Sequence, residues 1–216
     1  HHPTGGPSMR LLLINPNTSQ ATTQAMVGIA RETAPSVEID GLSAPFGVPL
    51  ITGPEELAIG HDAVVTLMAA RPPFGYQGVI IAAFGDPALD DLRRSVAVPV
   101  TGIAEAGMAE AAHHGRFAVV TTTPDLTASI AARADAYGHG DSFLGTVLTG
   151  GDVHRVMADR QGLGRALLKA GRRAVDQLGA RAIVIGGGPL AVAAREIADQ
   201  LPVPVIEPVP AAVRLA

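Results

Sequence analysis

Two turns in the sequence stand where short apolar runs end, and both are placed to hold a ligand. The first follows the run in GVIIAAFGDPAL, residues 78–89, and the second follows the run in AIVIGGGPLA, residues 182–191. Open α/β sheets bind ligands at the carboxyl ends of their strands. Backbone N–H groups in such turns can hold a carboxylate or stabilise an enolate oxygen. We expect ligand contacts from Ala83, Phe84 and Gly85 in the first turn and from Gly187, Gly188 and Pro189 in the second.

Two further loops carry hydroxyl and amide side chains at the ends of predicted strands. Helix N-termini with free N–H groups and such side chains bind carboxylates and other acidic groups. Asn17 also suits a structural role, as the N-cap of a helix in which Gln20 completes a capping box. The sequence leaves both interpretations of Asn17 open. The expected ligand contacts are Asn15, Asn17 and Thr18 in the first loop, Thr121, Thr122 and Thr123 in the second, and Phe46 elsewhere.

The elements that must position these loops alternate between strands and helices. Short apolar runs predict strands near 10–15, 37–41, 78–83, 98–102, 116–121, 144–148, 181–186 and 203–206, with helices between them. The series is doubled, because RLLLINPNTS at 10–19 aligns with RFAVVTTTPD at 116–125, an offset of 106. We therefore predict an α/β protein of two pseudo-symmetric, Rossmann- or flavodoxin-like domains, each with a four-stranded parallel sheet, and a site in the cleft between them.

Composition restricts the possible partners. The chain has 216 residues, of which 47% are hydrophobic and 17% charged, with a net charge of −4 and no Lys/Arg-rich stripe, so we expect no nucleic-acid partner. No apolar run reaches the roughly 18 residues of a membrane helix, so we expect no membrane partner and a cytoplasmic location. The absence of cysteine excludes disulfides and thiolate metal ligands. We interpret residues 1–8, HHPTGGPS, as a tag remnant.

Seven segments together resemble one protein family: LLLINPNTS, GPEELAIGHDAVV, IIAAFGDPAL, VTGIAEAG, VVTTTP, IVIGGGPLA and VPVIEPVPAAVRLA. In this order they are similar to the aspartate/glutamate/hydantoin racemase superfamily, particularly its hydantoin and allantoin racemase branch. The resemblance implies no cofactor, a homo-oligomer, and substrates with an acidic proton beside a carbonyl. It also implies that the helix after Glu207 packs on the first half, which gives domains at 9–102 plus 207–216 and at 103–206.

The resemblance also implies a reaction for which the chain lacks the expected groups. Racemisation through a planar carbanion needs one group that removes a proton and another that returns it on the opposite face. In the family both are cysteines, which align here with Ala83 and Gly187, so both thiols are absent. Asp86 and Glu105 are the nearest carboxylates that could replace them. However, Asp86 before Pro87 also fits a helix N-cap, and Glu105 fits the first turn of a helix.

Two functions stay open on this reasoning. One is a racemase, isomerase or carbon-acid lyase that acts on a small anionic or ureide-type molecule with a substituted proton carrier, and we favour it because the scaffold and loops persist. The other is a catalytically impaired protein that binds such a molecule without turnover. The sequence assigns no catalytic residue to either.

Cofactor and metal motifs are weak. GGGPLA fits a dinucleotide fingerprint with Glu207 about twenty residues later, but only nine residues follow Glu207, too few to complete a nucleotide-binding half. His139 and Asp141 lie close in sequence without a third ligand placed by spacing. We therefore expect neither a dinucleotide nor a metal.

Overall fold

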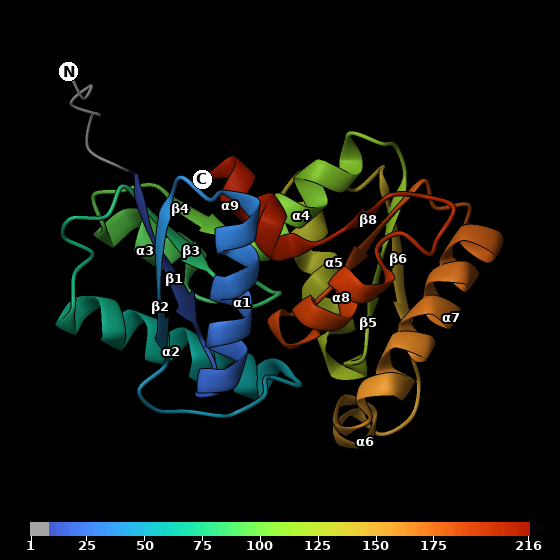
Figure 1. Cartoon of the computed structure of the whole chain (residues 1–216), viewed down its shortest axis with the longest axis horizontal. Coiled ribbons are helices and arrows are strands. Elements are labelled where there is room, and N and C mark those ends of the chain that lie inside the picture. The colour runs from blue at the N-terminus through green and yellow to red at the C-terminus, as the bar shows by residue number, and fades with distance from the viewer. Residues whose placement is uncertain (1–8) are drawn as a thin grey trace.

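The fold consists of two four-stranded parallel sheets that lie side by side (Figure 1). A computed structural model describes residues 9–216, so the predicted tag remnant at 1–8 lies outside the described residues. The first sheet has the order β2-β1-β3-β4, formed by β1 (Arg10–Asn15), β2 (Glu38–Ser43), β3 (Gly78–Ile81) and β4 (Val100–Gly102). The second has the order β6-β5-β7-β8, formed by β5 (Phe117–Thr121), β6 (Phe143–Leu148), β7 (Ala182–Ile185) and β8 (Val205–Ile206).

The two sheets repeat one topology, which confirms the predicted doubling. In each sheet the first strand pairs with the second and third, and the third pairs with the fourth, always in parallel. All eight predicted strands are present. Parallel strands need crossover connections, and helices provide them: α1 (Gln20–Thr33), α2 (Pro54–Ala70) and α3 (Leu89–Ser95) in the first half, and α5 (Thr127–Ala136), α6 (Val153–Ala158), α7 (Arg160–Leu178) and α8 (Ala191–Ile197) in the second. Helix α4 (Ile103–Ala112) joins the two sheets, and α9 (Pro208–Leu215) follows the last strand.

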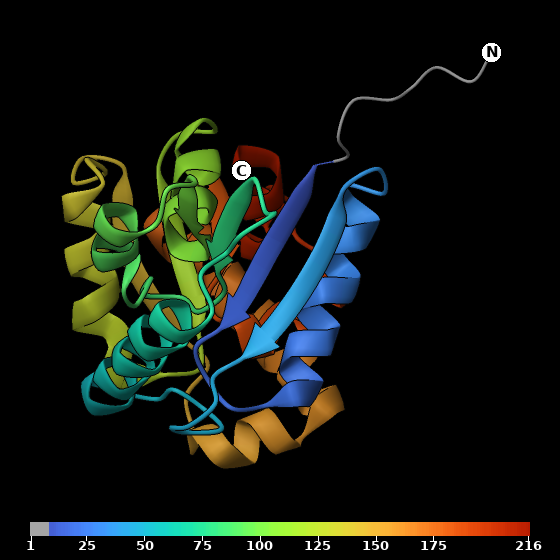
Figure 2. The same ribbon diagram turned by 90° about the vertical axis from the view of Figure 1, so that its left-hand side faces the viewer.

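Each sheet is covered on both faces, and the alternation of side chains along the strands shows how. In β1, Leu11 and Leu13 pack in one core cluster with α1, whereas Leu12 and Ile14 pack in another with α2 and α3. Figure 2 shows α1 and α2 on opposite sides of the first sheet. Burial on both faces explains why β3 and β7 are apolar and buried throughout.

One apolar core joins the two halves. It contains Leu11 and Leu13 from β1 together with Phe117 and Val119 from β5, so the inner faces of both sheets share it. Helices α4 and α9 pack against each other between the sheets in Figure 1, and both contribute buried residues to this core. Helix α9 also contacts α1. The shared core holds the carboxyl ends of the two sheets in a fixed relation.

The division of the chain into domains at 9–102 plus 207–216 and at 103–206 stays a prediction. Helix α4, which would open the second domain, contacts both β4 and β7. Within the part of the chain described by the structure, no helix is both long and apolar enough to cross a membrane.

Phe117→Ala tests the shared core. The side chain is fully buried and its ring packs edge-on against His139 at 5.7 Å between centroids. Its removal should lower the free energy of unfolding by about 3–5 kcal/mol through the cavity it leaves. Urea unfolding measures this as a lower midpoint with an unchanged slope.

The matched control is Phe74→Ala, the same change at a side chain that is 85% exposed. Measured at a protein concentration at which the chain is monomeric, this variant should change the free energy of unfolding by no more than about 0.5 kcal/mol. Equal losses in the two variants would contradict the proposed importance of the core.

Candidate functional site

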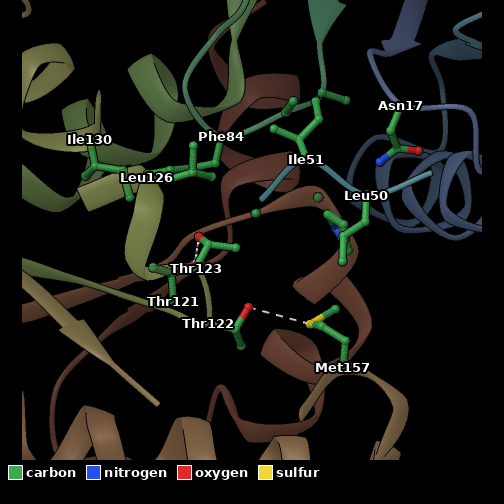
Figure 3. Close-up of a pocket in the computed structure, with 15 residues that line it drawn as sticks. Asn17, Leu50, Ile51, Phe84, Thr121, Thr122, Thr123, Leu126, Ile130 and Met157 are labelled. Atoms are coloured by element: carbon green, nitrogen blue, oxygen red, sulfur yellow. Dashed lines mark hydrogen bonds between the residues drawn. The ribbon is translucent and has the colours of Figure 1, made fainter. Parts of the chain in front are cut away.

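Four loops converge at the carboxyl ends of the two sheets and line one cleft (Figure 3). The cleft contains about 530 Å³ of empty space, part of it open to solvent, which suits a small ligand. Both halves contribute to it, as the sequence predicts. The lining residues are Asn17, Leu50, Ile51, Ala82, Ala83, Phe84, Thr121, Thr122, Thr123, Leu126, Ile130, Met157, Gly187, Gly188 and Pro189.

The loop after β1 is held by two asparagine side chains. The Asn15 Nδ2 donates to Asn17 Oδ1 at 2.9 Å, and the Asn17 N–H donates to Asn15 Oδ1 at 3.0 Å. Asn17 Oδ1 also accepts from the Ser19 N–H at 2.9 Å. Asn15 is fully buried and does not line the cleft, whereas Asn17 lies at its wall. The Asn17 oxygen is thus engaged, and its amide NH₂ remains to face a ligand.

The predicted N-cap at Asn17 is wrong. Helix α1 begins at Gln20, and its N-cap is Ser19, whose Oγ accepts from the Thr22 N–H at 3.2 Å. The predicted capping box fails with it, because Gln20 is the first helical residue. Asn17 instead forms its hydrogen bonds with Asn15. Backbone N–H groups of this loop are also already bonded, Thr18 to the Val48 carbonyl at 2.9 Å and Ser19 to Asn17, so they are not free for an anion.

The loop after β5 places three threonines at the opposite wall. Thr121 Oγ1 donates to the Gly186 carbonyl at 3.2 Å and lies 3.3 Å from Thr123 Oγ1. Thr122 Oγ1 contacts the Met157 sulfur at 3.6 Å. Thr123 is offset by 106 from Asn17, so the two loops occupy corresponding places in the two halves. The hydroxyl groups can both donate and accept hydrogen bonds.

The two turns named first meet at the floor of the cleft. A Cβ on Gly188 would lie 2.9 Å from the Ala82 carbonyl oxygen and 2.8 Å from the Met26 sulfur, so only glycine allows this approach. The hydrogen bonds of the turns themselves run from Asp86 N to Ala83 O and from Leu190 N to Gly187 O. The N–H groups of Phe84, Gly187 and Gly188 are not used in these bonds.

The structure leaves several predicted contacts outside the lining. Thr18 bonds through its backbone to Val48, and Phe46 is 44% exposed on the segment between β2 and α2. Gly85 lies behind Phe84, where its carbonyl accepts from Arg133 Nε at 2.9 Å. With Asn15, these are the predicted site residues that the structure does not bring to the cleft.

The sequence reasoning missed six lining residues, five of them larger than alanine. Leu50 and Ile51 come from the segment between β2 and α2, and Met157 comes from α6. A signal for two of them was present, since Met157 follows Ile51 by 106 residues, the same offset as the repeat. The others are Ala82, Leu126 and Ile130.

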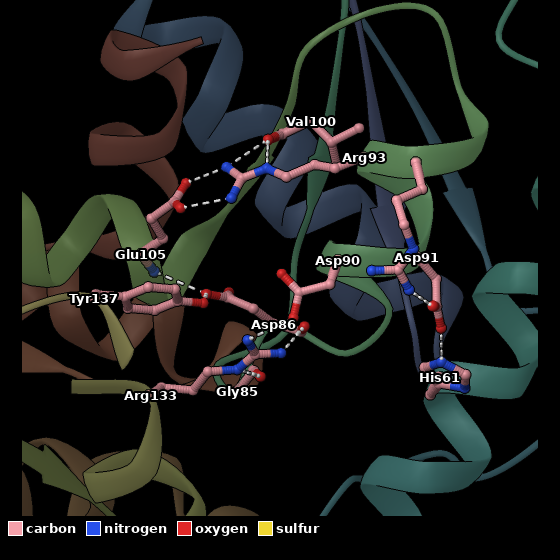
Figure 4. A network of polar contacts seen from close by, with 11 residues as sticks. His61, Gly85, Asp86, Asp90, Asp91, Arg93, Val100, Glu105, Arg133 and Tyr137 are labelled. Atoms are coloured by element: carbon pink, nitrogen blue, oxygen red, sulfur yellow. Dashed lines mark hydrogen bonds and ion pairs between the residues drawn. The ribbon is translucent and has the colours of Figure 1, made fainter. Parts of the chain in front are cut away.

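The carboxylates considered as substitute bases lie elsewhere (Figure 4). Asp86 is fully buried, and its carboxylate accepts from the N–H groups of Ala104 and Glu105, both at 2.9 Å. Burial raises the pKa of Asp86 to about 6. Glu105 lies in the first turn of α4 as predicted, but it forms an ion pair with Arg93 at 2.6 Å. Neither residue lines the cleft.

The predicted N-cap role of Asp86 also needs correction. Helix α3 begins at Leu89 after Ala88. The Asp86 carbonyl accepts from the Leu89 N–H at 3.2 Å, but the Asp86 side chain makes no capping bond to this helix. Its carboxylate instead caps α4, 18 residues further along the chain, a contact that sequence spacing does not reveal.

No ionisable side chain is present among the described residues that line the cleft. Within residues 9–216, no group of three or more His, Cys, Asp or Glu side chains is arranged to hold a metal ion. The site therefore offers hydroxyl, amide and main-chain groups as its polar chemistry.

Comparisons with known proteins agree with this architecture. The family model described as Asp/Glu/Hydantoin racemase matches residues 11–216. The hydantoin racemase of Paenarthrobacter aurescens is 32% identical over 214 residues, covering 96% of this chain and 89% of that protein. The structure of allantoin racemase from Klebsiella pneumoniae has a TM-score of 0.89 at 36% identity, covering 96% of this chain and 86% of that one.

A second solved structure gives the same result. Allantoin racemase from Pseudomonas fluorescens has a TM-score of 0.89 at 28% identity, covering 96% of this chain and 88% of that one. The chain belongs to the Asp/Glu/hydantoin racemase family.

Ala83 and Gly187, the positions that the sequence resemblance aligns with the family cysteines, differ in backbone geometry. Ala83 does not have a positive φ, and it lines the cleft. Gly187 has φ 110° and ψ 131°, a backbone conformation that residues other than glycine rarely adopt. The space beside Gly187 is open enough, since an added Cβ would lie 3.7 Å from Leu190. Backbone strain, not crowding, opposes a side chain there.

Ala83→Cys and Gly187→Cys should therefore differ in stability. The first should change the free energy of unfolding by less than about 1 kcal/mol. The second should lower it by about 1–3 kcal/mol, because the new residue must adopt an unfavourable φ. Chemical denaturation under reducing conditions compares the two.

Gly28→Cys is the matched control for the second change. Gly28 lies within α1, and an added Cβ there meets nothing within 4 Å. This variant should not be destabilised. A Gly187→Cys protein as stable as the Gly28→Cys protein would disprove the strain argument.

Proposed function

We propose that this chain binds a small, neutral, cyclic ureide of the hydantoin type in the cleft and moves its α-proton without a cofactor. The observation that carries the proposal is the cleft lining, in which polar uncharged groups from both halves accompany apolar side chains and no described lining side chain is charged. A ureide offers carbonyl and N–H groups that such a lining can pair with. A carboxylate would bind less well, because no cationic side chain among the described lining residues would offset the cost of removing its charge from water.

The relatives support the same substrate class. The similar proteins from Paenarthrobacter aurescens and Klebsiella pneumoniae are named a hydantoin racemase and an allantoin racemase. Both names refer to compounds with an acidic proton beside a ureide carbonyl. The proposal extends this class to the present chain.

The cleft can stabilise the charge that proton removal creates. When the C–H bond breaks, its electron pair moves to the adjacent carbonyl oxygen and forms an enolate. The Asn17 amide, the Thr122 hydroxyl and the N–H groups of Phe84 and Gly187 are donors at the walls and floor. Donors fixed before the reaction can each contribute about a hundredfold or more in rate.

The apolar wall would hold the substituent on the reacting carbon. Branched aliphatic, aromatic and thioether side chains form it, and they favour an alkyl or aryl group over a charged one because burying a charge without a partner is costly. These side chains are Leu50, Ile51, Phe84, Leu126, Ile130 and Met157.

Water in the cleft would carry the proton. Threonine hydroxyls and asparagine amides do not ionise near neutral pH, so neither can act as a strong base. The proton passes to water, and its return from water on the opposite face inverts the centre. Without a paired acid and base, turnover is expected to be slow compared with an enzyme that has them, because general acid–base catalysis contributes about 10²–10⁴ in rate.

A second candidate function rests on the same absence. Since the described lining residues carry no ionisable side chain, the cleft also suits a protein that binds the ureide and does not turn it over. The two functions predict equal binding and different proton exchange.

We also propose a cytoplasmic, homo-oligomeric protein. The exposed ring of Phe74, beside a surface hollow lined by Val65, Met68 and Tyr76, supports association between copies. Light scattering after size exclusion measures the assembly state.

Proton exchange in deuterated water tests the function. NMR should show loss of the α-proton signal of 5-benzylhydantoin faster than in buffer alone, and no such loss for aspartate. Ala83→Cys should accelerate the exchange by about tenfold or more, because a thiolate at the floor can accept the proton directly. Saturable binding with exchange at the buffer rate would favour the second candidate, and absence of binding would contradict both.

Asn17→Asp tests the wall of the cleft. The new carboxylate keeps an oxygen for Ser19 and Asn15 but loses the NH₂ donor, so the Kd for 5-benzylhydantoin should rise about tenfold, equivalent to ~1.4 kcal/mol. Calorimetric titration measures the affinity. Gln20→Glu is the control, since it makes the same change of amide to acid at an exposed neighbouring position and should leave the Kd unchanged.

A further inference from the structure

The turn after β3 has an unusual backbone. Gly85 has φ 126°, and Asp86 and Ala88 have φ 52° and 69°. Within residues 9–216, Asp86 and Ala88 are the non-glycine residues with positive φ. Such conformations persist only where surrounding contacts enforce them. The turn that carries Ala83 and Phe84 into the cleft therefore depends on outside support.

The Asp86 carboxylate provides one part of this support. Its two oxygens accept separately from the N–H groups of Ala104 and Glu105 at the start of α4, and the Tyr137 hydroxyl donates to Oδ2. A Cβ on Gly102 would overlap the carboxylate at 2.3 Å, so the carboxylate fills the space that glycine leaves. Each oxygen of the side chain is thus engaged by a donor from another segment.

Arg133 provides the other part. Its Nε donates to the Gly85 carbonyl at 2.9 Å and its Nη2 to the Asp86 carbonyl at 2.8 Å (Figure 4). Arg133 lies on α5 and Tyr137 ends it, four residues apart, so both reach the turn from one side of that helix. Helix α5 follows β5 in the second half of the chain, whereas the turn follows β3 in the first.

We propose that Asp86, Arg133 and Tyr137 form a latch, by which α5 holds the β3–α3 turn in the shape that places Ala83 and Phe84 in the cleft. The three are positioning residues, because none of them lines the cleft. The importance of the turn for a ligand rests on the proposed function. The latch itself does not, since it is a property of the free protein.

The latch has a charge environment that makes it sensitive to pH. Arg133 and Tyr137 face Asp86 from α5, and Glu105 lies beside it on α4. Two residues of α3 pair with these groups: Arg93 with Glu105, and Asp90 with Arg133. Burial raises the pKa of Asp86 to about 6, while the Tyr137 bond and the two N–H bonds act in the opposite direction. Ionisation of Asp86 therefore places a buried negative charge in the latch, which these donors only partly offset.

The sign of the pH effect follows from the raised pKa. Because the folded pKa of Asp86 lies above its ordinary value of 3.8, the contribution of this group to the free energy of unfolding is fully present below about 3.8 and declines as pH rises through about 6. An opened turn exposes Asp86 to water and restores its ordinary pKa, so the turn should also loosen as pH rises through about 6. A general weakening of the protein at low pH would have a different source.

Tyr137→Phe tests the latch by amide hydrogen exchange. Protection of the Asp86, Ala104 and Glu105 amides should fall at least about tenfold at neutral pH relative to amides of β7. The pH midpoint for loss of protection should move upward, because the variant lacks a donor that lowers the pKa of Asp86. Arg133→Lys should reduce protection of the same turn, since a single ammonium cannot reproduce the fork of two bonds.

Two control variants match these changes. Tyr76→Phe removes a similar phenol–carboxylate bond, 2.6 Å to Asp40, and Arg31→Lys removes a guanidinium fork on the Ile39 carbonyl. Neither should change protection of the β3–α3 turn. Any of three results would overturn the latch. The turn could be protected equally in Tyr137→Phe and the parent, the pH midpoint for loss of protection could stay unchanged, or protection could fall uniformly across the chain.

Titration with 5-benzylhydantoin in parallel distinguishes this proposal from the proposed function. If the parent binds the hydantoin, Tyr137→Phe should bind it about tenfold more weakly at the pH where the turn loosens. If the parent does not bind it and the exchange results hold, the proposed function fails and the latch stands. Equal affinity in the two proteins, with the turn loosened, would overturn the role of the latch in shaping the cleft.

Discussion

The apolar core shared by the two sheets is the constraint on which the site depends. Alternate residues of β1 and β5 point into it, and Phe117 and Leu13 are fully buried there. Because the strands are parallel within each sheet, this single packing arrangement directs the loops of both halves to one place. The cleft therefore exists before any ligand is bound. The close approach of Gly188 to Ala82 completes its floor and leaves no room for a side chain between the turns.

The chemistry of the cleft follows from what the two halves contribute. Each supplies a polar loop and a turn, and neither supplies an acid or base to the described lining. The arrangement can stabilise charge on a ligand oxygen without providing a proton carrier of its own. In a family of racemases, such a lining would separate charge stabilisation from proton transfer, and under the proposed function this chain would supply the first with polar uncharged groups alone.

Most of the fold could be predicted from the sequence, because its signals are local and repeated. Apolar runs bounded by turn residues marked all eight strands, and the repeat offset gave their pairing into two sheets. The failures involve contacts that sequence spacing does not reveal. Asn17 resembles a helix cap in the sequence, but its side-chain oxygen accepts a hydrogen bond from the buried Asn15. Asp86 resembles a cap for the next helix, but its carboxylate serves α4. Leu50 and Met157 lie in irregular or short segments, where periodicity gives no indication of which side chain faces the cleft.

The place of Met157 has a consequence for how the protein responds to oxidants. The chain contains no cysteine, so peroxide finds no thiol to attack. Among the described residues that line the cleft, Met157 supplies the sulfur atom, and this atom contacts the Thr122 hydroxyl. The corresponding residue in the other half is Ile51, whose side chain does not react with peroxide. Conversion to the sulfoxide would turn one apolar wall into a polar acceptor and leave the other unchanged. Oxidative damage would thus make the two sides of the cleft less alike, and methionine sulfoxide reductases could reverse it.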